Sequence, residues 1–217
     1  MLDAKICENA VYKKANLPER FRIERLQEGD LPEAIRLINE HNFDRMHFVP
    51  FTMESFQSRI SAIPGYGPDD FWTVKDEGRI VACAGLWDCS RLFEMCYTRE
   101  PLMWKIMGKI MGLLGRLIKC PKIPSEGDFF KLCYITDHAF DSGASQAMLA
   151  LLGHFNNLLL EARRDYFAAV LDESDPLFGV IGKLKPQIET NKVYAKSLQG
   201  EKPAFSPFYV DIRDLVL

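Results

Sequence analysis

The 217-residue sequence has few features of a nucleic-acid-binding, metal-binding or secreted protein. Its formal net charge is -3 at pH 7, so it lacks the excess of Lys and Arg that nucleic-acid binders carry. Its six cysteines include no CxxC pair, and no His stands at zinc-finger spacing from them. No apolar run follows the first five residues, as a secretory leader would require. We expect a cytoplasmic chain with reduced thiols, no nucleic-acid partner and no metal site.

The most apolar segment, residues 101–119, is too charged to cross a membrane. Lys105, Lys109, Arg116 and Lys119 interrupt it. A spanning helix needs ~20 mostly uncharged residues, and charges at bilayer depth are costly. The sequence therefore predicts no transmembrane segment.

The same segment predicts a helix with a wide apolar side and a narrow basic side. Such a helix can bind a membrane surface, fill a partner's groove, close as a lid over a substrate site, or cover the protein's own core. We expect it to cover the core and keep the other three roles as alternatives. The apolar side comprises Met103, Ile106, Met107, Ile110, Leu113, Leu114 and Leu117, and the narrow side Lys105, Gly108, Lys109, Gly112, Arg116 and Lys119.

Composition and length favour one globular domain. Hydrophobic residues make up 47% of the chain and charged residues 26%, a balance that supplies a full core. A length of 217 residues suits one α/β domain and is short for two. Residues 1–20 are mixed and polar, so we expect an N-terminal arm before a single domain at 21–217.

Periodicity and turn residues predict a layered order of strands and helices. Long apolar helices between strands favour the α/β class, with a mixed central sheet flanked by helices. Residues 91–127 form a helical insertion between the third and fourth expected strands. The expected strands are 21–26, 71–75, 80–87, 131–136, 166–171, 188–198 and 208–212. The expected helices begin near Asp30, Thr52, Ser145 and Pro176.

A loop of small residues joins the fourth expected strand to a long apolar helix. It reads Phe140-Asp141-Ser142-Gly143-Ala144-Ser145. Unpaired amides and the helix dipole at such a terminus favour an anion. With the order of elements over residues 21–214, this loop resembles the GNAT (Gcn5-related N-acetyltransferase) superfamily, as a divergent member. The alternative is that residues 141–143 only turn the chain and cap the helix.

The resemblance implies acetyl-CoA or another acyl-CoA as co-substrate, with its pyrophosphate on the loop pattern (Arg/Gln)-x-x-Gly-x-(Gly/Ala). Gly143 matches the first glycine and Ser145 replaces the second small residue, while Phe140 replaces Arg or Gln. The carboxylate of Asp141 would repel a pyrophosphate. The cofactor-binding residues implied in this way are Ile135, Phe140, Asp141, Ser142, Gly143, Ala144, Ser145 and Asp175.

A second landmark of the family is an Asn followed six residues later by a Tyr that protonates the leaving thiolate. Asp175 stands at the Asn position and Ile181 at the Tyr position. Isoleucine cannot donate a proton, so the family's usual general acid is absent. The standard mechanism does not transfer unchanged.

The catalytic candidates are Tyr134, Asp137 and His138. We expect Asp137 and His138 just after the strand, at the mouth where an amine arrives, where a His can act as base near neutral pH. The alternatives are a solvated loop pair and, for Tyr134, a packing residue. The backbone N–H of Ile135 is our candidate donor to the thioester oxygen.

Four further side chains have weaker chemical readings. Glu173 could bind a cation or serve as base, although a turn carboxylate is the plainer reading, and Tyr194 could replace the missing acid. Cys83 and Cys133 lie in strand patterns, where buried thiols are usually inert.

The predicted function is N-acyl transfer from acyl-CoA to an amine of a small molecule or peptide. The alternative is a non-catalytic GNAT-fold domain that binds CoA or another ligand, or that mediates interactions. A homodimer is left open. The missing Tyr favours the alternative, and the strand–loop–helix unit favours the enzyme.

Overall fold

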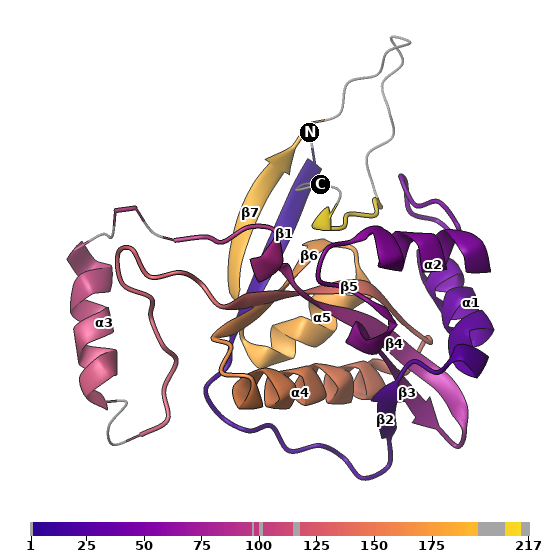
Figure 1. Cartoon of the computed structure of the whole chain (residues 1–217), viewed down its shortest axis with the longest axis horizontal. Helices are drawn as coiled ribbons and strands as arrows, with labels where there is room; N and C mark the ends of the chain where they lie inside the picture. The colour runs from indigo at the N-terminus through magenta and orange to yellow at the C-terminus, as the bar shows by residue number, and fades with distance from the viewer. Residues whose placement is uncertain (1, 97, 100–101, 115–117, 195–206, 214–217) are drawn as a thin grey trace.

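The computed structural model describes residues 2–96, 98–99, 102–114, 118–194 and 207–213. They form one mixed sheet with helices on both faces, as predicted (Figure 1). The strands are β1 (Leu2–Ala10), β2 (Arg22–Arg25), β3 (Phe71–Asp76), β4 (Arg79–Asp88), β5 (Leu132–Phe140), β6 (Tyr166–Asp172) and β7 (Gln187–Val193). The helices are α1 (Leu31–Asn42), α2 (Met53–Ala62), α3 (Leu102–Leu114), α4 (Ser145–Glu161) and α5 (Pro176–Ile181).

The sheet has the strand order β2-β3-β4-β5-β6-β1-β7. All neighbouring pairs are antiparallel except β5 and β6, which run parallel. A parallel pair needs a crossover connection, and α4 supplies it. The single parallel pair therefore lies at the centre of the sheet, where the loop before α4 begins.

Two apolar cores lie on opposite faces of the sheet. On one face α1 and α2 contribute Leu37, Ile38 and Phe56, all at most 2% exposed. On the other, α4 and α5 contribute Met148, Leu151 and Leu177, all fully buried. Helix α4 is apolar over most of its surface because it is covered on several sides. The two cores hold β5 and β6 firmly between them.

The expected N-terminal arm is wrong in its first half. Residues 2–10 form β1, which inserts between β6 and β7 and pairs with both. Ala4 and Cys7 are fully buried there. The segment is polar and short of branched apolar residues, so its strand character comes from pairing on both edges and not from local propensity.

The C-terminal strand predictions are corrected too. Residues 208–212 do not form a regular strand; Phe208 makes one isolated bridge to Met46. The side chains of Phe208 and Ile212 nevertheless enter the core, at 3% and 7% exposed. The expected strand 188–198 is found as β7, 187–193, and residues 195–198 lie outside the described part of the chain.

The predicted insertion helix exists as α3, but it does not cover the core. Figure 1 shows α3 standing apart from the sheet. Leu102, Met103 and Leu113 are each at least 65% exposed. Of the predicted helix positions, Arg116 and Leu117 lie outside the described residues. No described helix is long and apolar enough to cross a bilayer.

Candidate functional site

The parallel strands β5 and β6 separate part-way along their length. Their pairing covers only Leu132–Tyr166, Cys133–Phe167 and Tyr134–Ala168. Beyond that point β5 continues to Phe140 and β6 to Asp172. From Ile135 and Ala169 onward the facing edges of β5 and β6 have no ladder partner in each other, and this unpaired stretch is called the gap below.

A bulge in β5 accompanies this separation. The register with β4 shifts between Cys83 and Gly85, opposite residues 137–138. Asp137 has φ of +45°, a left-handed conformation that is uncommon for a residue with a side chain. Bulges bend a strand and redirect its side chains. This one sends the two successive polar side chains into different surroundings.

Close packing behind the bulge requires a glycine in β4. A Cβ built on Gly85 would lie 1.7 Å from the Tyr66 hydroxyl and 2.5 Å from Oγ1 of Thr136. The Thr136 hydroxyl donates to the Tyr66 hydroxyl at 3.1 Å. Any side chain at position 85 would push these groups away.

The loop after β5 leaves the N-terminus of α4 open. Gly143 has φ of +91°, and an added Cβ would meet no atom within 4 Å. The Ala144 amide donates to the Asp141 carbonyl at 2.9 Å, and no side chain caps the helix. In the first turn the Ala147 amide donates to the Ala144 carbonyl at 3.0 Å, which leaves the amides of Ser145 and Gln146 for an anion. Residues 141–144 do turn the chain, as the alternative proposed, but no side chain among them caps the helix.

This loop borders a pocket of about 270 Å³ that contains two arginines and two carboxylates. Arg79 Nη2 lies 2.9 Å from Asp141 Oδ2, and Arg20 Nε lies 3.1 Å from Asp76 Oδ1. Both guanidinium groups are largely exposed, at 65% and 70%. Arg79 thus offsets the charge of Asp141, whose repulsion of a pyrophosphate was the sequence-based objection to this site.

His138 belongs to a buried ion network at the open end of the gap. Its Nε2 lies 2.9 Å from Oδ2 of Asp175, which Arg45 Nη1 also contacts at 2.9 Å. Oδ1 of Asp175 accepts from the Leu177 amide at 2.8 Å and so caps α5. The carboxylate of Asp175 is therefore occupied by groups of the chain itself. The ring of His41 lies 5.7 Å from that of His138.

The charge of Asp175 is fixed by this network. Burial by itself would raise the pKa of its carboxyl group, but His138, His41 and Arg45 outweigh burial and hold the pKa well below its ordinary value. An ionised carboxylate only accepts hydrogen bonds, so Asp175 favours His138 with a proton on Nε2.

His41, His138 and Asp175 bring three possible metal-ligand atoms within 4.8 Å of one another. However, the Arg45 guanidinium already contacts the same carboxylate at 2.9 Å. A divalent cation there would lie beside a fixed positive charge. We therefore assign these residues to an ion network and not to a metal centre.

Asp137 joins a second network on the other side of the bulge. Its Oδ1 accepts from Nη2 of Arg213 at 2.5 Å, and Nε of Arg213 donates to Asp211 at 2.7 Å. Arg59 lies within 3.9 Å of both carboxylates. Oδ2 of Asp137 is buried without a hydrogen-bond partner among the described residues. Asp137 is thus committed to a buried salt bridge.

The expected exposed mouth at Asp137 and His138 is wrong in its location. Both residues lie within β5 and are 2% and 7% exposed. Sequence reasoning missed the other members of the two networks, which all lie more than 70 positions from Asp137 and His138 in the chain: His41, Arg45, Arg59, Asp211 and Arg213. No local pattern marks these partners, because tertiary packing alone brings them together.

The structure also places Tyr134, Ile135 and Ile181. Tyr134 packs against Trp87 in the core, where burial raises the pKa of its phenol. Ile135 is the first β5 residue beyond the paired region, as our candidate thioester contact requires. Ile181, at the position of the family's acid, is fully buried among core side chains.

The structure gives no chemical role to the four weaker candidates Glu173, Tyr194, Cys83 and Cys133. The side chain of Glu173 is 69% exposed and forms a 3.8 Å ion pair with Lys5. Tyr194 is 76% exposed. Burial raises the pKa of Cys133 to about 12 and that of Cys83 further still, so both thiols stay protonated.

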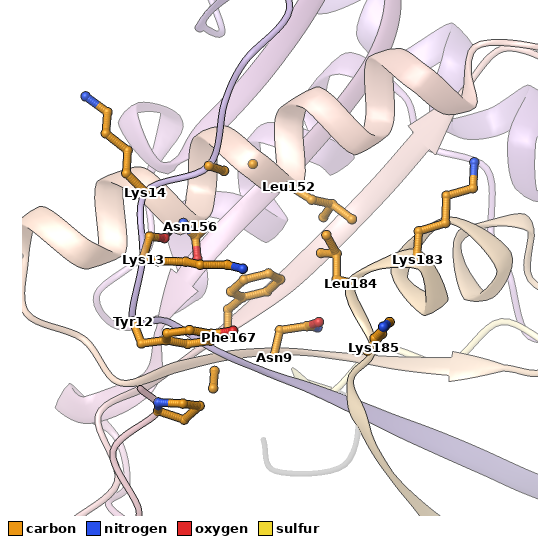
Figure 2. Close-up of a pocket in the computed structure, with 14 residues that line it drawn as sticks. Asn9, Tyr12, Lys13, Lys14, Leu152, Asn156, Phe167, Lys183, Leu184 and Lys185 are labelled. Carbon is orange, nitrogen blue, oxygen red and sulfur yellow. Dashed lines mark hydrogen bonds between the residues drawn. The ribbon is translucent and has the colours of Figure 1, made fainter. Parts of the chain in front are cut away.

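A second pocket of about 550 Å³ lies between the end of β1, α4 and the turn after α5. The ammonium group of Lys13 lies over the ring of Tyr12, 5.5 Å from its centroid, and Asn9 lines the same pocket (Figure 2). Asn9 is 5% exposed, and neither polar atom of its side chain has a hydrogen-bond partner among the described residues. Lys14, Lys183 and Lys185 also line this pocket, which is therefore the more cationic of the two.

The fold matches solved acyltransferase structures. A GCN5-related N-acetyltransferase from Sphaerobacter thermophilus matches with TM-score 0.50 and 11% identity over 88% of this chain and 50% of that one. N-Myristoyltransferase from Saccharomyces cerevisiae with bound myristoyl-CoA and inhibitors matches with TM-score 0.53 and 12% identity over 87% of this chain and 46% of that one. The chain has the GNAT fold and spans about half the length of these proteins.

Comparison by sequence gives no match, either to a protein-family model or to a curated protein. The GNAT fold is therefore carried by the arrangement of strands and helices, at identities too low to transfer residue roles.

Proposed function

We propose that the chain binds an acyl-CoA and transfers its acetyl or other acyl group to an amine of a small molecule or peptide. The observation that carries this proposal is the uncapped N-terminus of α4, placed directly after the strand that separates from β6. An anion site and a gap for an extended chain are thereby adjacent. Acyl-CoA has that shape, a pyrophosphate followed by a long, narrow pantetheine arm.

The backbone of residues 142–146 would hold the pyrophosphate, aided by the exposed guanidinium groups of Arg20 and Arg79. The pantetheine arm would lie in the gap, where the edges of β5 and β6 offer unpaired backbone groups. The amide of Ile135 would donate to the thioester oxygen and stabilise its negative charge as the amine attacks. Each of these contacts is made mainly by backbone, so the altered side chains of the loop do not prevent it.

His138 is our candidate base. Asp175 orients the ring and keeps Nε2 protonated, which leaves Nδ1 to take the proton from the attacking amine. The amine nitrogen forms a bond to the thioester carbon, the carbon–sulfur bond breaks, and CoA leaves as thiolate. With a pKa near ~8.5 that thiolate can leave without the family's tyrosine. Asp137 holds Arg213 and positions the bulge.

Binding is tested by thermal unfolding with acetyl-CoA. A ligand at 100 times its Kd stabilises the protein by about 2.7 kcal/mol, which a melting curve resolves. Gly143→Glu should abolish the shift by adding bulk and charge to the loop. Gly127→Glu is the matched control, since Gly127 also has positive φ, +84°, and open space around it. An unchanged shift in Gly143→Glu would place CoA elsewhere, and Lys13→Glu then tests the second pocket.

Catalysis is tested by CoA release from acetyl-CoA across a panel of amines. His138→Gln should lower turnover about 10²-fold or more while leaving the acetyl-CoA shift in place. Turnover that ignores this change would show that another group is the base.

The alternative is a non-catalytic CoA-binding domain. The two buried ion networks favour it, because they occupy both polar side chains of the bulge. Firm acetyl-CoA binding without turnover on any amine would support that function.

A further inference from the structure

The insertion between β4 and β5 exposes an unusual amount of apolar surface. Ten of the sixteen large hydrophobic side chains found exposed in the described chain lie between residues 92 and 129. Figure 1 shows that α3, at the centre of this region, stands clear of the sheet. The ten are Leu92, Met95, Leu102, Met103, Ile106, Met107, Ile110, Leu113, Ile118 and Phe129.

The exposed side chains of α3 share one face. At 3.6 residues per turn, its six exposed apolar residues occupy an arc of about 140°. Ile106 and Ile110 lie near the middle of that arc, each 51% exposed. Contiguous apolar surface of this kind marks an interaction site.

The opposite side of α3 faces the returning chain. Trp104, Gly108 and Met111, spaced as one helix side, are half-buried. Cys120 Sγ donates to the Met111 carbonyl at 3.2 Å, and Lys105 forms a 2.9 Å ion pair with Glu126. The helix is therefore anchored with the side of Trp104, Gly108 and Met111 inward and its wide apolar arc outward.

The charged residues of the segment 101–122 are all basic. Residues 101–122 contain no Asp or Glu but carry Lys105, Lys109, Arg116, Lys119 and Lys122. Lys109 lies at the border of the apolar arc, from where a long side chain reaches polar surroundings while its stem follows the apolar face. This segment is cationic in a chain whose net charge is -3.

We propose that the outward face of α3 docks on an anionic lipid surface. A helix with a wide apolar arc and bordering cations lies in the plane of the membrane interface, with its apolar face among the upper acyl chains. The lipid phosphates would attract Lys109 at the border of the arc. Because the face projects from the sheet, it can meet a flat surface without hindrance from the fold.

A second copy of the chain fits this face less well. Six side chains on one 13-residue helix offer less than the roughly 800 Å² per partner that a standard stable interface buries. A symmetric contact between two α3 helices would also bring their cationic borders together. The anionic bilayer requires neither a larger area nor a compensating acidic patch.

The test is flotation of the full chain with vesicles of phosphatidylcholine alone and with phosphatidylserine added. Parent protein should float with the anionic vesicles and much less with the neutral ones, and salt should weaken the binding. Ile106→Asp with Ile110→Asp should abolish binding. Lys109→Glu should weaken it roughly 10- to 30-fold, since each charge near such a surface matters. Phe43→Asp is the matched control, because Phe43 is 78% exposed but lies outside the insertion.

Each variant is also checked for its melting temperature, which should not change, because the substituted side chains are exposed. Absence of parent binding to anionic vesicles, or equal binding by the Ile106/Ile110 variant, would overturn the proposal. A dimer of the parent in analytical ultracentrifugation that this variant disrupts, without vesicle binding, would make a second copy the occupant.

Discussion

The bulge at residues 137–138 and the loop at residues 142–146 lie next to each other in the chain but differ in what their polar groups contact. At the bulge, both side chains are buried: His138 contacts Asp175, the N-cap of α5, which Arg45 also contacts, and Asp137 contacts Arg213 of the C-terminal segment. At the loop, the helix terminus has no side-chain cap and its surroundings are open.

The difference indicates which part of the site is ready for a ligand. The loop can receive an anion without losing any contact that the chain now makes. Any chemistry at the bulge would use Asp137 or His138, whose buried ion pairs also stabilise the fold. Substitutions at the two places should therefore separate stability from ligand binding.

The largest effect is expected at the bulge, on stability. Asp175→Ala removes the cap of α5 and leaves Arg45 buried at 4% exposure without its carboxylate. Breaking a buried ion pair from one side typically costs about 3–5 kcal/mol. Urea unfolding measures this loss. Glu173→Ala, at a carboxylate two positions away that is 69% exposed, should stay within about 0.5 kcal/mol of the parent. Equal costs would mean that the network is not a stabilising element.

The pH dependence of the unfolding free energy tests the same network around Asp175. Asp175 has a pKa held well below its unfolded value of 3.8, so its contribution is present above that value and is lost progressively as the pH falls from there through the folded-state pKa. The parent should therefore lose unfolding free energy between about pH 5 and pH 3. In Asp175→Asn this loss should be smaller, because that carboxylate no longer titrates. Urea titrations at several pH values measure it, and identical slopes would contradict the assignment.

The sequence could predict the loop but not the bulge, for a physical reason. The loop depends on adjacent residues: Gly143 supplies the positive φ, and a strand and an apolar helix flank it. The ion networks depend on Arg45, Asp211 and Arg213, which no local period connects to β5. β1 was missed for the same reason, since its pairing with β6 spans most of the chain.

The orientation of α3 was also beyond prediction. Its periodicity correctly gave a helix with a wide apolar side, but periodicity cannot tell whether that side meets the core or the outside. A buried helix and an interfacial helix share the same pattern. Only the position of α3 apart from the sheet decides between them.

A smaller effect is expected from Ile181→Tyr, which would restore the family's acid. Ile181 is fully buried in the core beneath α5, so a larger ring must displace its neighbours. Overpacking costs about 1–3 kcal/mol. Urea unfolding should show this loss, and CoA release should not increase. The matched control is Ile181→Leu, which conserves volume. A gain in turnover would mean that position 181 faces the gap.

The smallest effect is expected at the loop, from Asp141→Asn. The Asp141–Arg79 pair is partly exposed, with side chains 24% and 65% accessible, so its loss should change stability by less than about 1 kcal/mol. Removing the carboxylate frees Arg79 and lowers repulsion of the pyrophosphate. Acetyl-CoA affinity should therefore rise about two- to fivefold at low salt and less at high salt, since exposed charges are screened. Calorimetry at two salt concentrations measures this, with Asp69→Asn as an exposed control whose carboxylate lies outside the loop pocket. A fall in affinity would instead show that the Asp141–Arg79 ion pair orders the loop for binding. The accessible helix terminus that distinguishes the loop from the bulge would then depend on Asp141.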